Sequence, residues 1–175
     1  MEGRNKMKAS NLILSKDFPH FPELIDYDIP LELLDARVVT TLQKIRYVFG
    51  KAMHPTPDKE GWARLDGSKT SQHYAVGRLS KAGDFFPERG YMMECWLIAQ
   101  QIKDVMGIGL YLDTKGIDGA EWPMMHYDLR NSGKRVFWAR DKGEYYTLGL
   151  DDEGFWQCIN KLIEKDKEFR NGTAP

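Results

Sequence analysis

Four short segments between residues 108 and 150 have the pattern of β-strands, and they lie between two stretches with helical spacing. Their sequences are IGLYLD, MMHYDLR, RVFWAR and EYYTLGL, at residues 108–113, 124–130, 135–140 and 144–150. Adjacent strands between helices are typical of α+β folds. We therefore expect an α+β fold, with a small antiparallel sheet flanked by helices. The turn at residues 131–133 predicts a hairpin between the second and third strands.

Three helices are predicted around these strands, over residues 30–50, 88–106 and 151–169. The first is bounded by Pro30 and Gly50, which favour the start and the end of a helix. The segment between the first two helices is rich in Pro, Gly, Asp and Lys from residue 51 to residue 70. It is predicted to be a loop with one short strand near residues 62–64.

The size of the chain favours one domain. A chain of 175 residues with 42% hydrophobic residues can bury one sizeable core, and it is short for two. We expect a single domain over residues 1–175, with loose ends at 1–10 and 170–175.

The 25 Lys and Arg residues nearly balance the 26 Asp and Glu residues, and no basic cluster stands out. Nucleic acid is therefore not an expected partner.

The apolar segments and the cysteines indicate a reducing compartment. The N-terminal residues contain only the short apolar run at 12–14, which is not the apolar region of a secretory signal, and no run reaches membrane-spanning length. We expect synthesis in the cytoplasm, without membrane insertion. Cys95 and Cys158 are expected to be reduced, buried thiols remote from any metal, with a disulfide as the alternative.

The strand MMHYDLR has one apolar and one polar side. Alternation places Met125, Tyr127 and Leu129 on one face. His126 and Asp128 share the other face with Met124 and Arg130. The apolar face suits a core, so the polar face is available for chemistry.

Histidine is scarce in this chain, with four residues in all. His20 and His54 lie in proline-containing loops and are expected to be structural. His73 is followed after ten residues by Asp84, and together with His126 they supply two imidazoles and a carboxylate. These are ligand types of a catalytic zinc ion, which keeps a fourth position for water. On spacing alone, purely structural histidines remain the favoured alternative, because no compact HExxH motif is present.

Two motifs resemble one known family. The first comprises Ser71, His73, Gly77, Ala82 and Asp84, and it resembles the Ser-x-His…Gly…Ala-x-Asp signature of the zinc D-Ala-D-Ala carboxypeptidase family. That family includes phage-encoded peptidoglycan endopeptidases and shares its fold with the zinc-binding domain of hedgehog proteins. The second, MMHYDLRNSGKRVFW, resembles the family's hydrophobic pair followed by His-x-Asp, with basic residues and a Trp further on. The resemblance covers roughly residues 10–140.

The resemblance implies a hedgehog/DD-peptidase-like fold with His73, Asp84 and His126 as zinc ligands. The gap between the first two ligands is longer than is usual in the family, so an inserted loop is expected there. This longer gap bears on the assignment of Asp84 as a ligand more than on the assignment of either histidine.

The resemblance also implies an acidic residue that accepts a proton from the attacking water. Glu121, five positions before His126, is the first candidate, followed by Asp128 and then Asp118. Asp128 has two further interpretations, as a residue that supports a metal ligand and as a surface carboxylate paired with a nearby arginine.

An upstream arginine holds the substrate in the resembling family. Arg64 is the best positional match, and Arg78, inside the inserted loop, is the alternative. A solvent-facing arginine remains a competing interpretation of Arg64.

The expected function is that of a zinc-dependent peptidase acting on the stem peptide of bacterial peptidoglycan. The absence of a signal and the small size suggest a phage enzyme that is released by a holin or carried in a virion. The alternative from another class is a catalytically silent relative that serves as a phage structural or binding protein. A third interpretation is an α+β domain without a metal. The sequence does not indicate which peptide bond is cut.

Overall fold

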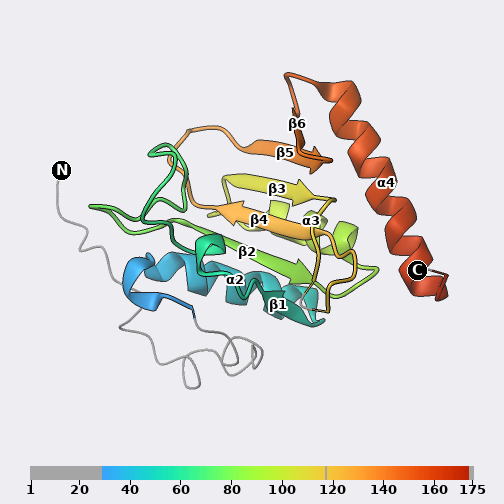
Figure 1. Cartoon of the computed structure of the whole chain (residues 1–175), viewed down its shortest axis with the longest axis horizontal. Helices are drawn as coiled ribbons and strands as arrows, with labels where there is room; N and C mark the ends of the chain where they lie inside the picture. Colours follow the sequence, from blue (N-terminus) through green and yellow to red (C-terminus); the bar gives the residue numbers. More distant parts are fainter. Residues whose placement is uncertain (1–28, 117, 174–175) are drawn as a thin grey trace.

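One mixed sheet forms the centre of the chain (Figure 1). The computed structural model describes residues 29–116 and 118–173. In these residues the sheet has six strands in the order β1-β2-β4-β3-β5-β6. Their bounds are β1 Met53–Pro55, β2 Ala82–Pro87, β3 Gly107–Tyr111, β4 Met124–Asp128, β5 Val136–Asp141 and β6 Glu144–Thr147. The α+β class is confirmed. The expectation of an antiparallel sheet is wrong for one pair, because β3 and β5 run parallel.

The predicted hairpin between the second and third strand segments is also wrong. Strand β4 pairs with β2 on one edge and with β3 on the other, which leaves no edge for β5. The hairpin instead joins β5 to β6 through Lys142 and Gly143, whose φ angles are 52° and 85°. Two consecutive positive φ values match the turn that best fits the twist of a two-residue hairpin.

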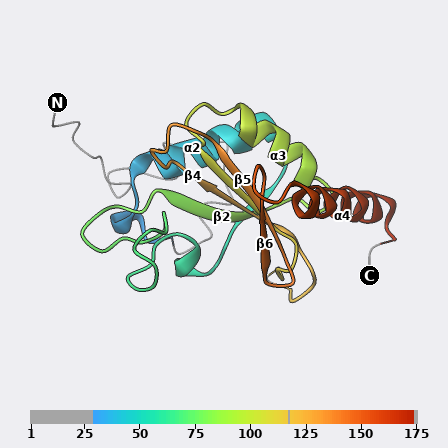
Figure 2. The ribbon, with the colours of Figure 1, turned by 90° about the horizontal axis from the view of Figure 1, so that it is seen from above.

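Three helices pack against the sheet, two over one face and the third beside the β5–β6 edge (Figure 2). They are α2 Ala36–Phe49, α3 Met92–Gln101 and α4 Asp152–Asn171. Alternate strand residues point into the core beneath them, and several are almost fully buried: Phe85, Ile108, Leu110, Met125, Tyr127 and Ala139. The apolar side of the MMHYDLR segment therefore faces the helices, as alternation predicts. Its polar side lies on the opposite face of the sheet.

Side-chain caps set where two helices begin, and both helices are shorter than predicted. The Asp35 carboxylate accepts the backbone N–H of Arg37 at 3.0 Å, so α2 starts at Ala36 and not at Pro30. The α3 helix starts after Gly90, whose φ is 84°. Asp166, from α4, accepts the N–H groups of Met92 and Met93 at 3.1 and 2.9 Å.

Of the remaining predictions about the fold, one is confirmed and others are wrong. Both cysteines are free and buried, as predicted. Residues 62–64 form no strand beyond an isolated bridge between Arg64 and Tyr74, whereas β1 and β2 were not predicted. Residues 170 and 171 belong to α4. His20 and the predicted loose residues 1–10 lie outside the described residues.

None of the helices in the described residues is long and apolar enough to cross a membrane.

Candidate metal centre

The open face of the sheet carries a row of residues that includes two of the candidate metal ligands. Register pairing aligns Asp84 of β2, His126 of β4, Gly109 of β3, Trp138 of β5 and Thr147 of β6. Side chains of register partners point to the same face of a sheet. The row therefore brings residues from five strands onto the face opposite the helices. The unpredicted strand β2 places Asp84 directly beside His126, despite the long gap that precedes it.

The loop before β2 presents His73 to this row. Its backbone is tied to a neighbouring segment, because Arg64 N–H donates to the His73 carbonyl at 2.7 Å. The guanidinium of Arg78 holds the same loop through the carbonyls of Lys69, Ser71 and Tyr74. Arg78, proposed as an alternative substrate residue, therefore fixes the loop that carries His73.

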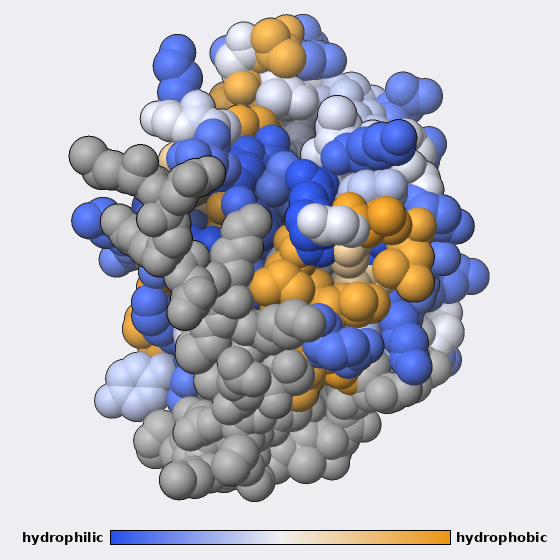
Figure 3. Space-filling view, turned by 90° about the vertical axis from the view of Figure 1, so that its left-hand side faces the viewer, coloured by the Kyte–Doolittle hydropathy of each residue, from blue (hydrophilic) through white to orange (hydrophobic). Residues whose placement is uncertain are grey.

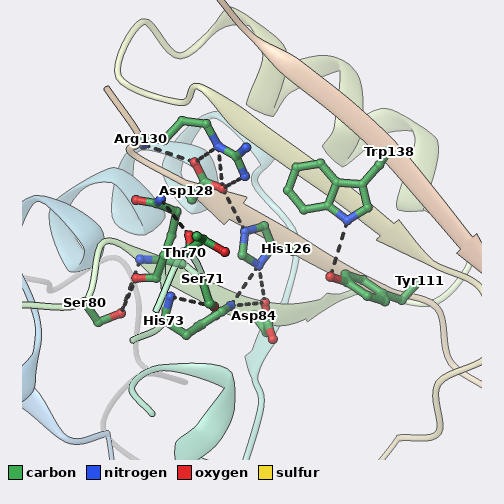
Figure 4. Close-up of polar contacts among 12 residues, drawn as sticks. Thr70, Ser71, His73, Ser80, Asp84, Tyr111, His126, Asp128, Arg130 and Trp138 are labelled. Carbon is green, nitrogen blue, oxygen red and sulfur yellow. Dashed lines mark hydrogen bonds and ion pairs between the residues drawn. The ribbon is translucent and has the colours of Figure 1, made fainter. Parts of the chain in front are cut away.

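Three ligand atoms converge at this point (Figure 4). His126 Nδ1 lies 2.9 Å from His73 Nε2 and 2.8 Å from Asp84 Oδ1. The third side of the triangle, from His73 Nε2 to Asp84 Oδ1, is 3.4 Å. With bonds of about 2.0–2.2 Å, neighbouring ligands of a tetrahedral zinc ion lie roughly 3.3–3.6 Å apart. The triangle is close to that size, so this buried group could hold a metal ion with a small outward movement of its side chains.

A buried ion pair orients His126. Its Nε2 lies 3.1 Å from Asp128 Oδ2, so Nε2 carries a proton and donates it to this carboxylate, while Nδ1 faces the triangle. Arg130 donates to both oxygens of Asp128, from Nε at 2.8 Å and from Nη2 at 2.5 Å. Such supporting carboxylates fix the orientation of metal-binding histidines. By contrast, the buried Nδ1 of His73 has no hydrogen-bond partner among the described residues.

The titration behaviour of the group reflects these contacts. Burial alone would raise the pKa of Asp84, but the charge of His73 and the hydrogen bond from His126 outweigh it and lower that pKa. Burial would also raise the pKa of Asp128, but hydrogen bonds with Arg130 and His126 outweigh it and lower that pKa. Burial would lower the pKa of His126, yet hydrogen bonds to Asp128 and Asp84 raise it to about 9. Both carboxylates therefore stay ionised and attract a cation.

Two glycines of β3 make room for the neighbouring side chains. A Cβ at Gly107 would lie 2.3 Å from Asp128 Oδ2, and one at Gly109 would lie 2.5 Å from the Trp138 indole. Both distances are shorter than any ordinary carbon contact. Glycine at these positions thus allows Asp128 and Trp138 to lie across β3.

The triangle opens into a cavity of about 470 Å³. Arg64, Tyr111, Trp138, Arg140 and Tyr145 are among the lining residues, together with the ligand group, Asp128 and Arg130. Figure 3 shows one side of the molecule, on which hydrophobic side chains form a patch among hydrophilic ones. The cavity lining is mostly polar, and its three arginines outnumber its two carboxylates, which favours a polar or anionic ligand over an apolar one.

The structure brings most of the predicted site residues together, with three exceptions, one of which is Arg78 in the loop before β2. Arg64 lines the cavity, as do the three predicted ligands and Asp128. Glu121 does not line it, because its exposed carboxylate pairs with Lys165 of α4. That hydrogen bond lowers the pKa of Glu121. Asp118 binds Arg89, also away from the cavity lining.

Sequence analysis missed several residues of the cavity wall, of which three are aromatic or charged. Tyr111, Arg140 and Tyr145 line the cavity from β3, β5 and β6. Alternation within the predicted strands places them on the same faces as Gly109, Trp138 and Thr147. That signal was present, but only the sheet order shows that these faces adjoin His126.

Comparison of the chain with protein-family models, with curated proteins and with solved structures found no match. The chemistry of the centre therefore rests on its donors. Two imidazoles and one carboxylate suit zinc, and the same set with open positions also suits iron(II).

Proposed function

We propose that this protein is a zinc-dependent peptidase that hydrolyses the stem peptide of bacterial peptidoglycan. One observation carries the proposal: the His73, Asp84 and His126 ligand atoms converge at the floor of an open, cationic cavity. The two sequence motifs that resemble the zinc D-Ala-D-Ala carboxypeptidase family supply the substrate class and the hedgehog/DD-peptidase fold as further parts of the proposal.

A zinc ion held by these three residues would lower the pKa of a coordinated water to about 7 and polarise the scissile carbonyl. Around it, the chain supplies positioning and proton transfer. Arg64 donates Nε to the Glu60 carbonyl at 3.1 Å, and its terminal nitrogens are available to hold a substrate carboxylate. Planar, two-pronged donors suit that task.

Proton acceptance is assigned to Asp84. In the described residues, the acidic side chains of the cavity lining are Asp84 and Asp128. Both oxygens of Asp128 are engaged by Arg130, and one also contacts His126. Oδ1 of Asp84 faces the two histidines, whereas its Oδ2 makes no hydrogen bond to any of the described residues. That second oxygen can accept a hydrogen bond from the attacking water and relay its proton to the leaving amine without remaining protonated, in keeping with the lowered pKa of Asp84.

Tyr111 is placed to stabilise negative charge on the scissile oxygen. Its hydroxyl accepts Trp138 Nε1 at 3.4 Å, and burial together with the charge of Asp84 raises its pKa. The hydroxyl therefore keeps its proton and donates it in a hydrogen bond to a developing oxyanion. Removal of one such donor costs about 10²–10³-fold in kcat in other enzymes.

Tyr111→Phe should therefore lower kcat for a stem peptide by about 10²-fold, with metal content unchanged. The measurement is steady-state hydrolysis beside metal analysis of the same sample. Tyr146→Phe, at a tyrosine of β6 that is not part of the cavity lining, is the matched control and should lose less than threefold. Equal losses in the two variants would contradict the role of Tyr111.

The function itself is tested with the purified protein. Metal analysis should find about one zinc ion per chain, and loss of turbidity of cell-wall sacculi should report hydrolysis. A chelator should stop that loss, and added zinc should restore it. A protein that binds zinc but cuts no peptidoglycan fragment would contradict the proposal.

One observation favours a second candidate, a catalytically silent relative that serves as a phage structural or binding protein. Glu121, the acid that the family resemblance favours, pairs with Lys165 outside the cavity lining. If Asp84 does not replace it, the centre binds a metal and a peptide without cutting. The turbidity assay separates the two candidates. Release by a holin or carriage in a virion is the setting that we propose for either one.

A further inference from the structure

Beyond Tyr111, the cavity has a cationic and aromatic end, at Arg140 and Tyr145, that lies away from the metal-binding triangle. Tyr111, Arg140 and Tyr145 are register partners in a second row, across β3, β5 and β6. This row lies two residues along the strands from the row that contains His126 and Trp138. Strands spaced by ~4.8 Å, with a rise of ~3.3 Å per residue, put the Cα atoms of Arg140 and His126 about 12 Å apart. The cavity thus extends well beyond the metal centre.

Arg140 is held rigidly at this end. Its Nε and Nη2 atoms lie 2.9 and 2.8 Å from Asp113 Oδ1, and Asp113 is itself anchored by the Gly143 N–H at 2.9 Å. The guanidinium carbon lies 4.6 Å from the ring centroid of Tyr111 and 6.0 Å from that of Tyr145. Tyr145 makes a further side-chain hydrogen bond with Arg140, so part of the five N–H donors of the guanidinium is left for a ligand. An arginine held in this way loses little side-chain freedom when its remaining donors bind a ligand.

The charges around the cavity indicate an anionic ligand. Three arginines line it, at positions 64, 130 and 140, against the two carboxylates of Asp84 and Asp128. The Asp128 charge is already matched by Arg130, and Asp113 matches the charge of Arg140. Arg64 and a metal ion would therefore more than offset the remaining charge of Asp84. A carboxylate fits the planar donors of Arg140 better than a neutral group does.

We propose that Arg140, between Tyr111 and Tyr145, is a specificity-determining residue that binds a carboxylate of an acidic peptide. An extended chain advances ~3.3–3.6 Å per residue, so the carboxylate lies about three residues from the bond that is cut. This inference rests on the proposed function and adds the class of substrate to it: peptides with a free carboxylate remote from the scissile bond.

Two synthetic stem peptides test the inference, one with free side-chain carboxylates and one with those groups amidated. Calorimetric binding and hydrolysis are measured on zinc-loaded protein. The wild type should prefer the free-acid peptide by about 10–100-fold in Kd, as expected for a hydrogen bond to a charged group. Arg140→Gln should abolish the preference through Kd and KM, with kcat changed less than threefold. Arg140→Lys keeps the positive charge but lacks the planar donors, so this variant should retain part of the preference for the free-acid peptide.

Arg37→Gln is the matched control. Arg37 also binds an aspartate through Nε and Nη2, at 3.0 and 2.7 Å, but it belongs to α2 and does not line the cavity. It should keep the full preference, and thermal unfolding should show that both glutamine variants are folded. Hydrolysis of both peptides without preference would overturn the subsite and leave the peptidase function standing. Preferential binding without hydrolysis would overturn the peptidase function and support the subsite. Neither binding nor hydrolysis would overturn both.

Discussion

His73→Ala and His126→Ala are each expected to abolish stoichiometric metal binding. Each variant removes one of three protein ligands, and the two that remain cannot hold zinc in a tetrahedral site with one open position. Zinc content should fall from about one ion per chain to below a tenth, and hydrolysis should disappear with it. Elemental analysis of purified, dialysed protein is the measurement.

His54→Ala is the control for this experiment. His54 lies on β1, where it packs edge-on against Trp122 with 5.2 Å between ring centroids, and it is not part of the ligand group. This variant should keep its metal. A full complement of zinc in either His73→Ala or His126→Ala would show that the triangle is not the binding site.

Asp128→Asn is expected to weaken metal binding by about 10–100-fold, the usual cost of losing a residue that orients a ligand. The neutral side chain no longer holds the His126 imidazole by a charged contact at 3.1 Å, and it leaves the Arg130 guanidinium without its ion-pair partner. Stability should fall as well, because breaking a buried pair on one side is costly. Competition with a chromophoric chelator measures the affinity.

Glu121→Gln is the comparison that decides between the acidic residues. Glu121 is exposed on the loop before β4, and its contact with Lys165 is a surface ion pair, so the variant should keep metal affinity, stability and turnover within about twofold. A hundredfold loss of turnover with zinc still bound would restore Glu121 as the proton acceptor. It would then have to leave Lys165 and reach the cavity.

The sequence by itself determined the residues of the candidate centre. Scarcity of histidine, the two short motifs and the alternation in MMHYDLR selected His73, Asp84 and His126, and the structure brings all three together. Alternation also separated the core face of β4 from its functional face. These features are local, or depend only on side-chain type, so the sequence alone is sufficient to identify them.

Tertiary structure decided what those residues have as neighbours. The order of the strands depends on which edges pair, and these edges can be far apart in the sequence. Strand β3 lies between β4 and β5. The sequence order of the strands therefore does not show that Arg140 and Tyr111 share the cavity. The start of α3 depends on Asp166, which reaches Met92 across 74 positions of sequence. Glu121 is five residues from His126, yet its carboxylate pairs with Lys165 of α4, because the loop before β4 is placed by packing and charge. Contacts of this kind form between segments far apart in the chain, and only their arrangement in space determines them.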